Sequence, residues 1–303
     1  MTQKSLIIEA AYFFLYGLLV TITYSVLKFV QVQYGFAGLA FGIMLAAALT
    51  WGASNADRFK SSAALTRIDF LRAISFSVSQ ILLIRSIFLF GVSVGFGASV
   101  AGVLSAILIS KLVFSEKISI GDLVFLFMAM VASFAINSSN SFPTSAFFSG
   151  LLQGLTLSMT KKISSNRSFN LKSVALSLTF FSAGLLIQAI LFKREILWSW
   201  NLVGGFSLLG LLSMFTQISY FIMCEKLSSP VVGAITLTRV PWSILLQGDF
   251  NNLSGSSLTG LAIFSLLIPS RYFFSYCDLK RGKLAAISSE KENQRDLANS
   301  AGR

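Results

Sequence analysis

The chain has 303 residues, of which 54% are hydrophobic and only 12% are charged, whereas an ordinary soluble domain carries about 25% charged residues. This composition excludes a soluble enzyme, a disulfide-rich secreted domain and a disordered chain, because too few polar residues are present to cover a soluble surface. The sequence has no histidine and only two cysteines, so we expect no metal site, no cofactor and no disulfide framework. These properties indicate an integral membrane protein.

Apolar stretches long enough to cross a bilayer, about 20 residues each, recur along the chain with short polar breaks between them. The first stretch is too long for the apolar core of a signal peptide, and none alternates apolar and polar residues as barrel strands do. We therefore predict an all-α fold with ten transmembrane helices. In chain order the predicted helices cover residues 6–27, 32–51, 70–90, 94–114, 118–136, 146–163, 173–192, 202–224, 230–246 and 256–277.

The basic residues predict the orientation of these helices. With the N-terminus in the cytoplasm, 19 lysines and arginines fall inside, three fall outside, and Arg85 and Arg239 fall within helices. Cytoplasmic loops collect basic residues, so the net charge of +12 indicates topology and not a surface for nucleic acid. The excess of basic residues on the cytoplasmic side holds only if the number of helices is even, so that both termini lie on that side. Residues 278–303 are polar and charged, which is typical of a disordered cytoplasmic tail.

This topology can be tested by labelling single cysteines from either side of the membrane. We expect Ser61, Asn166 and both termini to be labelled only from the cytoplasm, because basic loops stay on that side. Asn140 should be labelled only from outside. A cytoplasmic Asn140 would contradict the model of ten helices with both termini inside.

The two halves of the sequence share a pattern around an uncharged segment, residues 137–145. Residues 93–99 (SVGFGAS) are small, and the helix after them ends at residues 114–119 (FSEKIS). In the second half, residues 228–234 (SSPVVGA) lead to a helix that ends at residues 247–250 (QGDF). Five helices per half is an odd number, so the halves would enter the membrane from opposite sides. Inverted repeats of this kind are typical of secondary transporters, whose substrate site lies near the midplane.

This pattern resembles the ten-helix, EamA-type members of the drug/metabolite transporter superfamily. Ser115–Ser119 matches the Gly/Ser-Glu-x-hydrophobic-Ser/Pro element of that family, Gly248-Asp249 matches it weakly, and Thr238-Arg239-Val240 is similar to a Tyr-Thr-Arg-Leu run of some members. The resemblance implies one five-helix repeat over residues 1–137 and a second over residues 138–277. The two repeats should superpose after a half-turn about an axis in the membrane plane.

Arg239 lies near the centre of the predicted ninth helix, where an arginine costs about 2.5–3.5 kcal/mol to insert. Such a charge persists when it faces a cavity, a partner or a ligand. Its planar guanidinium could bind a carboxylate or phosphate of the substrate, or it could be a structural tie to polar neighbours. Pro241, two residues later, predicts a bend and a freed backbone carbonyl.

Four other ionisable residues are candidates. Arg85 could contact substrate or extend to the outer interface, and Lys111 could act in gating or extend to the inner one. Glu116 could close an inner gate or cap the following helix. Glu9 could be a proton relay or an interface residue. The lack of a carboxylate at mid-depth disfavours a proton-coupled exporter of cations and favours an anionic substrate.

Polar and aromatic residues within the helices could shape a cavity. Gln217 and Tyr220 are three residues apart and share a helix face, and Tyr24, Tyr220 and Trp242 could form an aromatic cage around a planar substrate. Glycines permit close helix contact, and Gly150-x-x-x-Gly154 fits packing within the chain or a dimer interface. Further polar candidates are Gln80, Gln153, Gln188 and Thr23.

Together these features predict a multi-pass carrier of the inner or plasma membrane that is not an enzyme. It would move a small polar metabolite by alternating access, as a monomer or homodimer, with the lipid bilayer and a small-molecule substrate as its partners. The substrate would bear a carboxylate and be amino-acid-like; the resemblance also admits S-adenosylmethionine. The alternatives are a membrane-embedded transferase or hydrolase, disfavoured by the lack of histidine and the 12 acidic residues, and a non-transporting scaffold.

Overall fold

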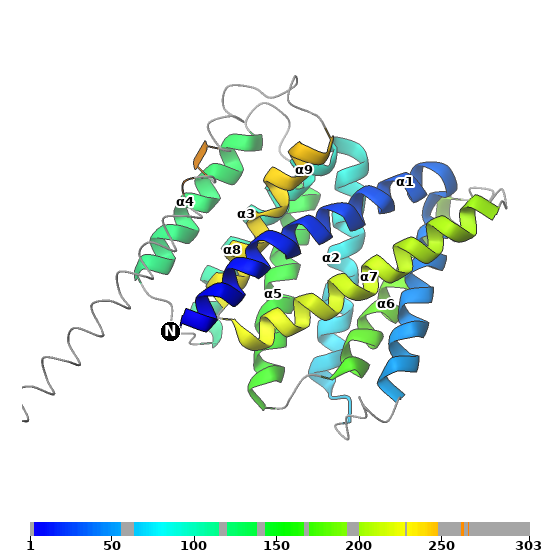
Figure 1. Ribbon diagram of the computed structural model, residues 1–303, viewed down its shortest axis with the longest axis horizontal. Helices are drawn as coiled ribbons and strands as arrows, with labels where there is room; N and C mark the ends of the chain where they lie inside the picture. The colour runs from blue at the N-terminus through cyan, green and yellow to red at the C-terminus, as the bar shows by residue number, and fades with distance from the viewer. Residues whose placement is uncertain are drawn as a thin grey trace, which may run out of the picture.

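The computed structural model describes residues 3–55, 64–114, 120–137, 143–166, 170–192, 200–227, 229–247, 262, 263 and 266. These residues form helices and no strand (Figure 1), which confirms the predicted all-α class. The helices are α1 (Gln3–Asn55), α2 (Arg67–Phe90), α3 (Val92–Phe114), α4 (Ile120–Asn137), α5 (Thr144–Asn166), α6 (Leu171–Phe192), α7 (Trp200–Lys226), α8 (Ser229–Leu237) and α9 (Arg239–Gln247).

Helices occupy nine of the ten predicted stretches. α1 covers the first two, α2 to α7 correspond to the third to the eighth, and α8 with α9 covers the ninth. The tenth and the tail after it lie almost entirely outside the described residues. Four described segments are long and apolar enough to cross a membrane, namely Phe14–Asn55, Arg67–Phe90, Leu171–Leu191 and Val203–Lys226.

α1 changes direction at Gly35, as Figure 1 shows at the end of its diagonal run. Gly35 has φ 66° and ψ −161°, a conformation that is strained for residues with a Cβ atom. We predicted the break at residues 28–31, because Lys28 follows an apolar run. The helix instead continues through Lys28, a good helix former, and breaks where glycine permits a positive φ.

α3 and α5 make the closest helix contact, through glycine. A Cβ atom added to Gly150 would lie 1.8 Å from the carbonyl oxygen of Ser99, and one added to Gly102 would lie 2.1 Å from that of Phe147. A Cβ on Gly154 would meet the Cβ of Ala106 at 2.2 Å. Of the two predicted roles of the Gly150-x-x-x-Gly154 motif, these contacts support packing within the chain.

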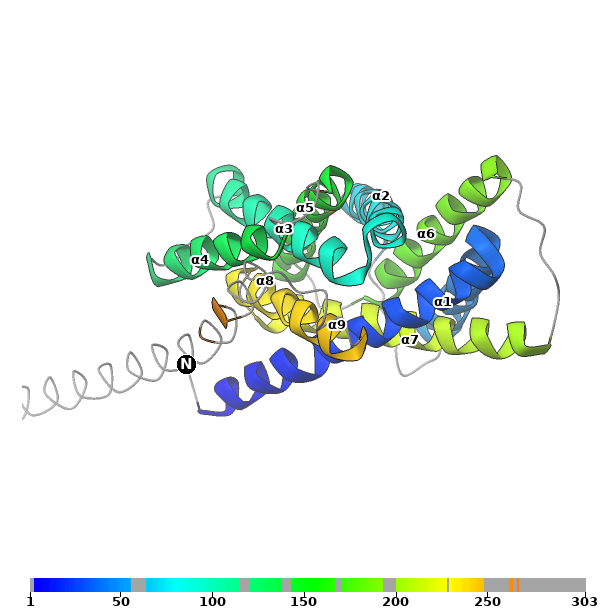
Figure 2. The same cartoon turned by 90° about the horizontal axis from the view of Figure 1, so that it is seen from above.

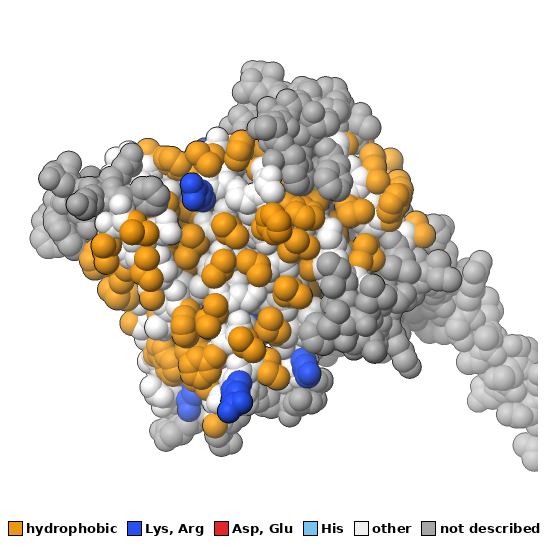
Figure 3. Space-filling view, turned by 180° about the vertical axis from the view of Figure 1, so that it is seen from behind, with side chains coloured by type: hydrophobic (Ala, Val, Ile, Leu, Met, Phe, Trp, Pro, Cys, Tyr) orange, Lys and Arg blue, Asp and Glu red, His pale blue; other side chains and the backbone are white. Residues whose placement is uncertain are grey.

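The remaining helices surround this pair. α5 also contacts α2, and α1 lies against α6 and α7; Figure 2 shows α8 and α9 between α3 and α1. Large apolar side chains remain on the outside, among them Ile190 and Leu191. Figure 3 shows such side chains spread over one face, with lysines and arginines near its edges, which is the distribution that a lipid environment favours.

Candidate functional site around Arg239

The helical path is interrupted at Thr238, between α8 and α9. Pro241 has no N–H group, so the carbonyl of residue 237 cannot receive its helical hydrogen bond. At the break, the backbone N–H and the hydroxyl of Thr238 both donate to the carbonyl of Ile235, at 3.1 and 2.7 Å. The helix is interrupted close to Pro241, and the interruption places Arg239 at the start of α9.

α1 packs closely against this break. A Cβ atom on Gly17 would lie 2.1 Å from Oγ1 of Thr238, so only glycine permits this approach. One turn further along α1, the Thr21 hydroxyl donates to the backbone carbonyl of Arg239, at 3.2 Å. α1 therefore supplies a hydrogen bond to a carbonyl at the helix break.

The Arg239 side chain is buried, with 2% of its surface exposed. Its Nη2 donates to Ser99 Oγ at 3.0 Å. Both Nη1 and Nη2 lie 3.4 Å from the single oxygen Oε1 of Gln153, longer than the usual 2.9–3.0 Å for such bonds. The guanidinium carbon lies 4.9 Å from the centre of the Phe96 ring, a cation–π contact.

This coordination of Arg239 is incomplete. Its Nε has no hydrogen-bond partner among the described residues, and the partners of its guanidinium in that part of the chain are hydroxyl, amide and ring groups without a carboxylate. A buried guanidinium held only by neutral groups can gain stabilisation from an anion.

Two of the predicted tyrosines lie around this centre. Tyr24 donates to Oε1 of Gln80 and meets the Phe96 ring edge-on, with 5.1 Å between ring centres. Tyr220 stacks on Tyr16 at 6.4 Å. Tyr16, Tyr24 and Tyr220 are all buried and lie near the Arg239 guanidinium.

Tyr16 was not among the predicted site residues. The signal in the sequence is its spacing of eight from Tyr24, about two helical turns, which places both rings on one face of α1. Gln217 lies one turn before Tyr220 in α7 and is half-buried. Trp242 packs edge-on against Phe14 at 5.0 Å, and Phe14 is an exposed side chain. The described ring contacts thus do not join Trp242 to Tyr24 and Tyr220.

Three predicted site residues have no described side chain. Glu9 lies in α1 and Lys111 in α3, but only the helical backbone is described at these positions. Glu116 lies outside the described residues. Their roles as a proton relay and as gating residues stay predictions.

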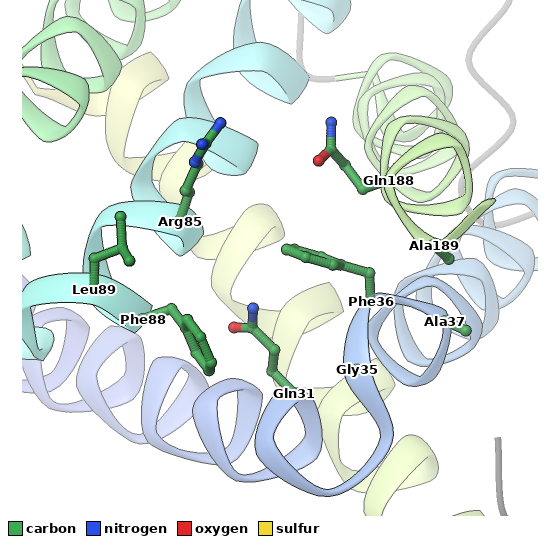
Figure 4. A pocket seen from close by; sticks show the side chains of 9 residues that line it. All are labelled: Gln31, Gly35, Phe36, Ala37, Arg85, Phe88, Leu89, Gln188 and Ala189. Atoms are coloured by element: carbon green, nitrogen blue, oxygen red, sulfur yellow. The ribbon is translucent and has the colours of Figure 1, made fainter. Parts of the chain in front are cut away.

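Arg85 lies in a different place, at a cavity of about 310 Å³ (Figure 4). Its side chain is exposed. The cavity is bounded by the bend of α1 and by the C-terminal ends of α2 and α6. Its lining residues are Gln31, Gly35, Phe36, Ala37, Arg85, Phe88, Leu89, Gln188 and Ala189.

A second buried arginine, Arg72, joins the first turns of α2 and α6. Only 1% of its surface is exposed. It donates to the Ser173 carbonyl and to the hydroxyls of Ser173, at 3.1 Å, and Ser177, at 2.7 Å. Its guanidinium carbon lies 4.2 Å from the centre of the Phe221 ring, and the Ser173 hydroxyl donates to buried Asp69 at 2.5 Å. We call Asp69, Arg72, Ser173 and Ser177 the α2–α6 clamp.

Replacing Arg72 by alanine should lower the free energy of unfolding by about 3 kcal/mol or more, because buried acceptors on α6 lose their donor. Arg72→Lys keeps the charge and should cost less. The measurement is thermal unfolding of the purified chain, and Arg85→Ala removes an exposed arginine from the same helix as a control. Equal melting temperatures for Arg72→Ala and Arg85→Ala would contradict this prediction.

Comparison with known proteins shows a shared fold. No family model matches the sequence, and no curated protein matches it. Among solved structures, 28 chains match. One of them, the crystal structure of a protein, has a TM-score of 0.65 at 13% identity, over 84% of this chain and 94% of that chain. The arrangement of helices is therefore similar to that of a solved protein along most of both chains.

Proposed function

We propose that the chain is a secondary transporter that moves a small, carboxylate-bearing metabolite across a membrane by alternating access. The observation that carries this proposal is the buried Arg239 at the break between α8 and α9. Discontinuous helices whose ends point at a charged substrate are a recurring device of transporters. An arginine buried in such a helix marks a functional site, because its burial is costly.

The contacts of Arg239 support a role in binding an anion. Gln153 makes two long bonds through one oxygen atom, so a carboxylate could replace it and make shorter, charge-assisted bonds. While the carboxylate replaces Gln153, the contacts with Ser99 and Phe96 would hold the guanidinium in place. The buried tyrosines around the arginine would supply hydroxyl and ring contacts to the rest of an amino-acid-like or S-adenosylmethionine-like substrate.

The proposal includes ten transmembrane helices in two inverted repeats, with both termini in the cytoplasm. In this orientation α2 and α6 both run outward. The cavity beside Arg85 then opens toward the outside, and the α2–α6 clamp lies near the cytoplasm. The described arrangement corresponds to a state in which the inner ends of α2 and α6 are held together and their outer ends are apart.

Uptake by proteoliposomes tests the proposed function. Proteoliposomes with the purified chain should take up one or more carboxylate-bearing metabolites, either down a concentration gradient or in exchange for internal substrate. Repeating the assay with a pH gradient tells whether uptake is coupled to proton movement. Protein-free liposomes and liposomes with Lys226→Gln, which removes an exposed charge at the end of α7, are the controls. Folded protein that moves none of an amino-acid, keto-acid and S-adenosylmethionine panel would contradict the proposal.

A further inference from the structure

We infer that the cavity between the α1 bend and the ends of α2 and α6 binds a small organic anion with an apolar body, such as an aromatic monocarboxylate. The inference goes beyond the proposed function and does not rest on it, because it concerns binding and does not require transport. It concerns a second anion site, separate in its lining residues from the one around Arg239.

The position of the cavity follows from how α2 and α6 pack. Their contacts keep a nearly constant register, so the helices run parallel from the clamp onward. The Ser77 hydroxyl donates to the Ser177 carbonyl at 3.4 Å, and the rings of Phe76 and Phe181 meet at 6.0 Å. A Cβ atom on Gly184 would lie 2.5 Å from Cδ1 of Ile81.

One turn beyond this last contact the two helices no longer fill the space between them. Arg85 follows Ile81 by four residues and Gln188 follows Gly184 by four, so each lies one helical turn further along its own helix. Both line the cavity. The α1 bend at Gly35 forms the opposite wall, and Figure 4 shows Gln31 and Phe36 projecting from it into the space. The cavity is thus produced by the α1 bend and the separated ends of two clamped helices.

The lining residues select a ligand with two chemically different parts. Arg85 has no hydrogen-bond or ion-pair partner among the described residues, and its guanidinium can bind a carboxylate through two parallel bonds. Gln31 of α1 and Gln188 of α6 supply amide donors from the other walls of the cavity (Figure 4). The other described lining residues are apolar or glycine, including Phe36 and Phe88.

The volume of the cavity and the charge of its lining narrow the class of ligand further. A volume of about 310 Å³ is at the lower end of the 300–1,000 Å³ range of ligand pockets, which fits a small metabolite. No acidic side chain is among the described lining residues, so a ligand ammonium group would gain no ion pair here. One arginine is also too little charge for a polyphosphate. A monoanion with an aromatic or branched body meets all of these conditions.

Equilibrium binding tests this inference without requiring transport. Titration calorimetry on the full chain in zwitterionic lipid nanodiscs would use 3-phenylpropionate, its neutral amide, and acetate. We expect 3-phenylpropionate to bind, and the amide to bind about tenfold more weakly or worse because it lacks the charge. Acetate should also bind more weakly, because it cannot bury an aromatic body.

Matched variants locate the binding in the cavity. Arg85→Gln should weaken 3-phenylpropionate binding about tenfold or more, and Gln188→Leu should weaken it several-fold. Lys226→Gln removes one exposed positive charge elsewhere and should leave the affinity unchanged. Circular dichroism and the melting temperature show that each variant is folded. Equal binding of acid and amide, or an unchanged affinity in folded Arg85→Gln protein, would overturn the inference.

A lipid headgroup could supply the same anionic chemistry, so the titration is repeated in nanodiscs that contain phosphatidylglycerol. We expect the native protein to keep its higher affinity relative to Arg85→Gln, although the anionic bilayer repels 3-phenylpropionate from both proteins alike. Loss of that difference would show that Arg85 holds a lipid and would overturn the inference. Arg85-dependent binding by a protein that moves no metabolite in proteoliposomes would contradict the proposed function and leave this site standing.

Discussion

Arg239→Ala is expected to weaken binding of the transported carboxylate by about 1.5–3 kcal/mol, which is about a 10- to 150-fold loss of affinity. The guanidinium is buried, and the groups that hold it in the described part of the chain are neutral, so its loss removes the positive charge that the substrate would pair with. Arg239→Lys keeps the charge but loses the bidentate geometry. Its affinity for the carboxylate should lie between those of the native chain and of Arg239→Ala. Substrate binding by purified variants is the measurement.

Thermal unfolding separates this role from a structural one. Arg239 also lies over Phe96 and bonds to Ser99, so its removal should lower the melting temperature too. If Arg239 binds substrate, saturating substrate should raise the melting temperature of the native chain much more than that of Arg239→Ala. Unchanged affinity in folded Arg239→Ala protein would reduce Arg239 to a structural tie between α9, α3 and α5.

Gly150→Ala is expected to lower the free energy of unfolding by about 3 kcal/mol or more, at the upper end of the overpacking range. The added Cβ atom would lie 1.8 Å from the carbonyl oxygen of Ser99, a backbone atom of α3 that cannot turn away. The two helices would have to separate, and the contacts along their whole interface would loosen. Thermal and denaturant unfolding of the purified chain measure the change.

Gly52→Ala is the matched control for this variant. No atom of the described residues lies within 4 Å of a Cβ atom at Gly52, and alanine is a better helix former than glycine by about 1 kcal/mol. Gly52→Ala should therefore leave the melting temperature unchanged or raise it. If Gly150→Ala were as stable as Gly52→Ala, the close contact of α3 and α5 would be wrong.

Much of the helical architecture could be predicted, because a chain that crosses lipid must satisfy its backbone hydrogen bonds internally. Apolar length alone therefore located nine of the helical stretches. The break beside Arg239 followed from Pro241, whose effect on a helix is local. The bend of α1 lies at Gly35 and not between the predicted helices at residues 6–27 and 32–51, because glycine permits a positive φ and the apolar pattern carries no signal of backbone conformation.

The polar clusters were harder to predict, because their members are far apart in the sequence. Arg72 was counted among the cytoplasmic basic residues that set the topology, yet it is buried by contacts with Ser173 and Ser177 of α6. Ser99 and Gln153 are similarly distant from Arg239. No local sequence pattern indicates which serine contacts which arginine, so predicting these pairs requires the three-dimensional arrangement of the helices.

The glycine contact between α3 and α5 has a consequence for how Arg239 can be released. Ser99 and Gln153, the hydrogen-bond partners of its side chain among the described residues, lie on helices whose backbones touch at Gly102 and Gly150, so they stay together unless that contact opens. A shift of α9 relative to this pair would break both bonds in the same event. In the substrate-free protein, the guanidinium would then exchange between an engaged and a released state without an intermediate held by one partner, whereas a substrate that displaces Gln153 would leave the bond to Ser99 in place. An anion that binds only the released state would shift the equilibrium toward that state. The size of the shift is set by how much more tightly the anion binds the released state than the engaged one.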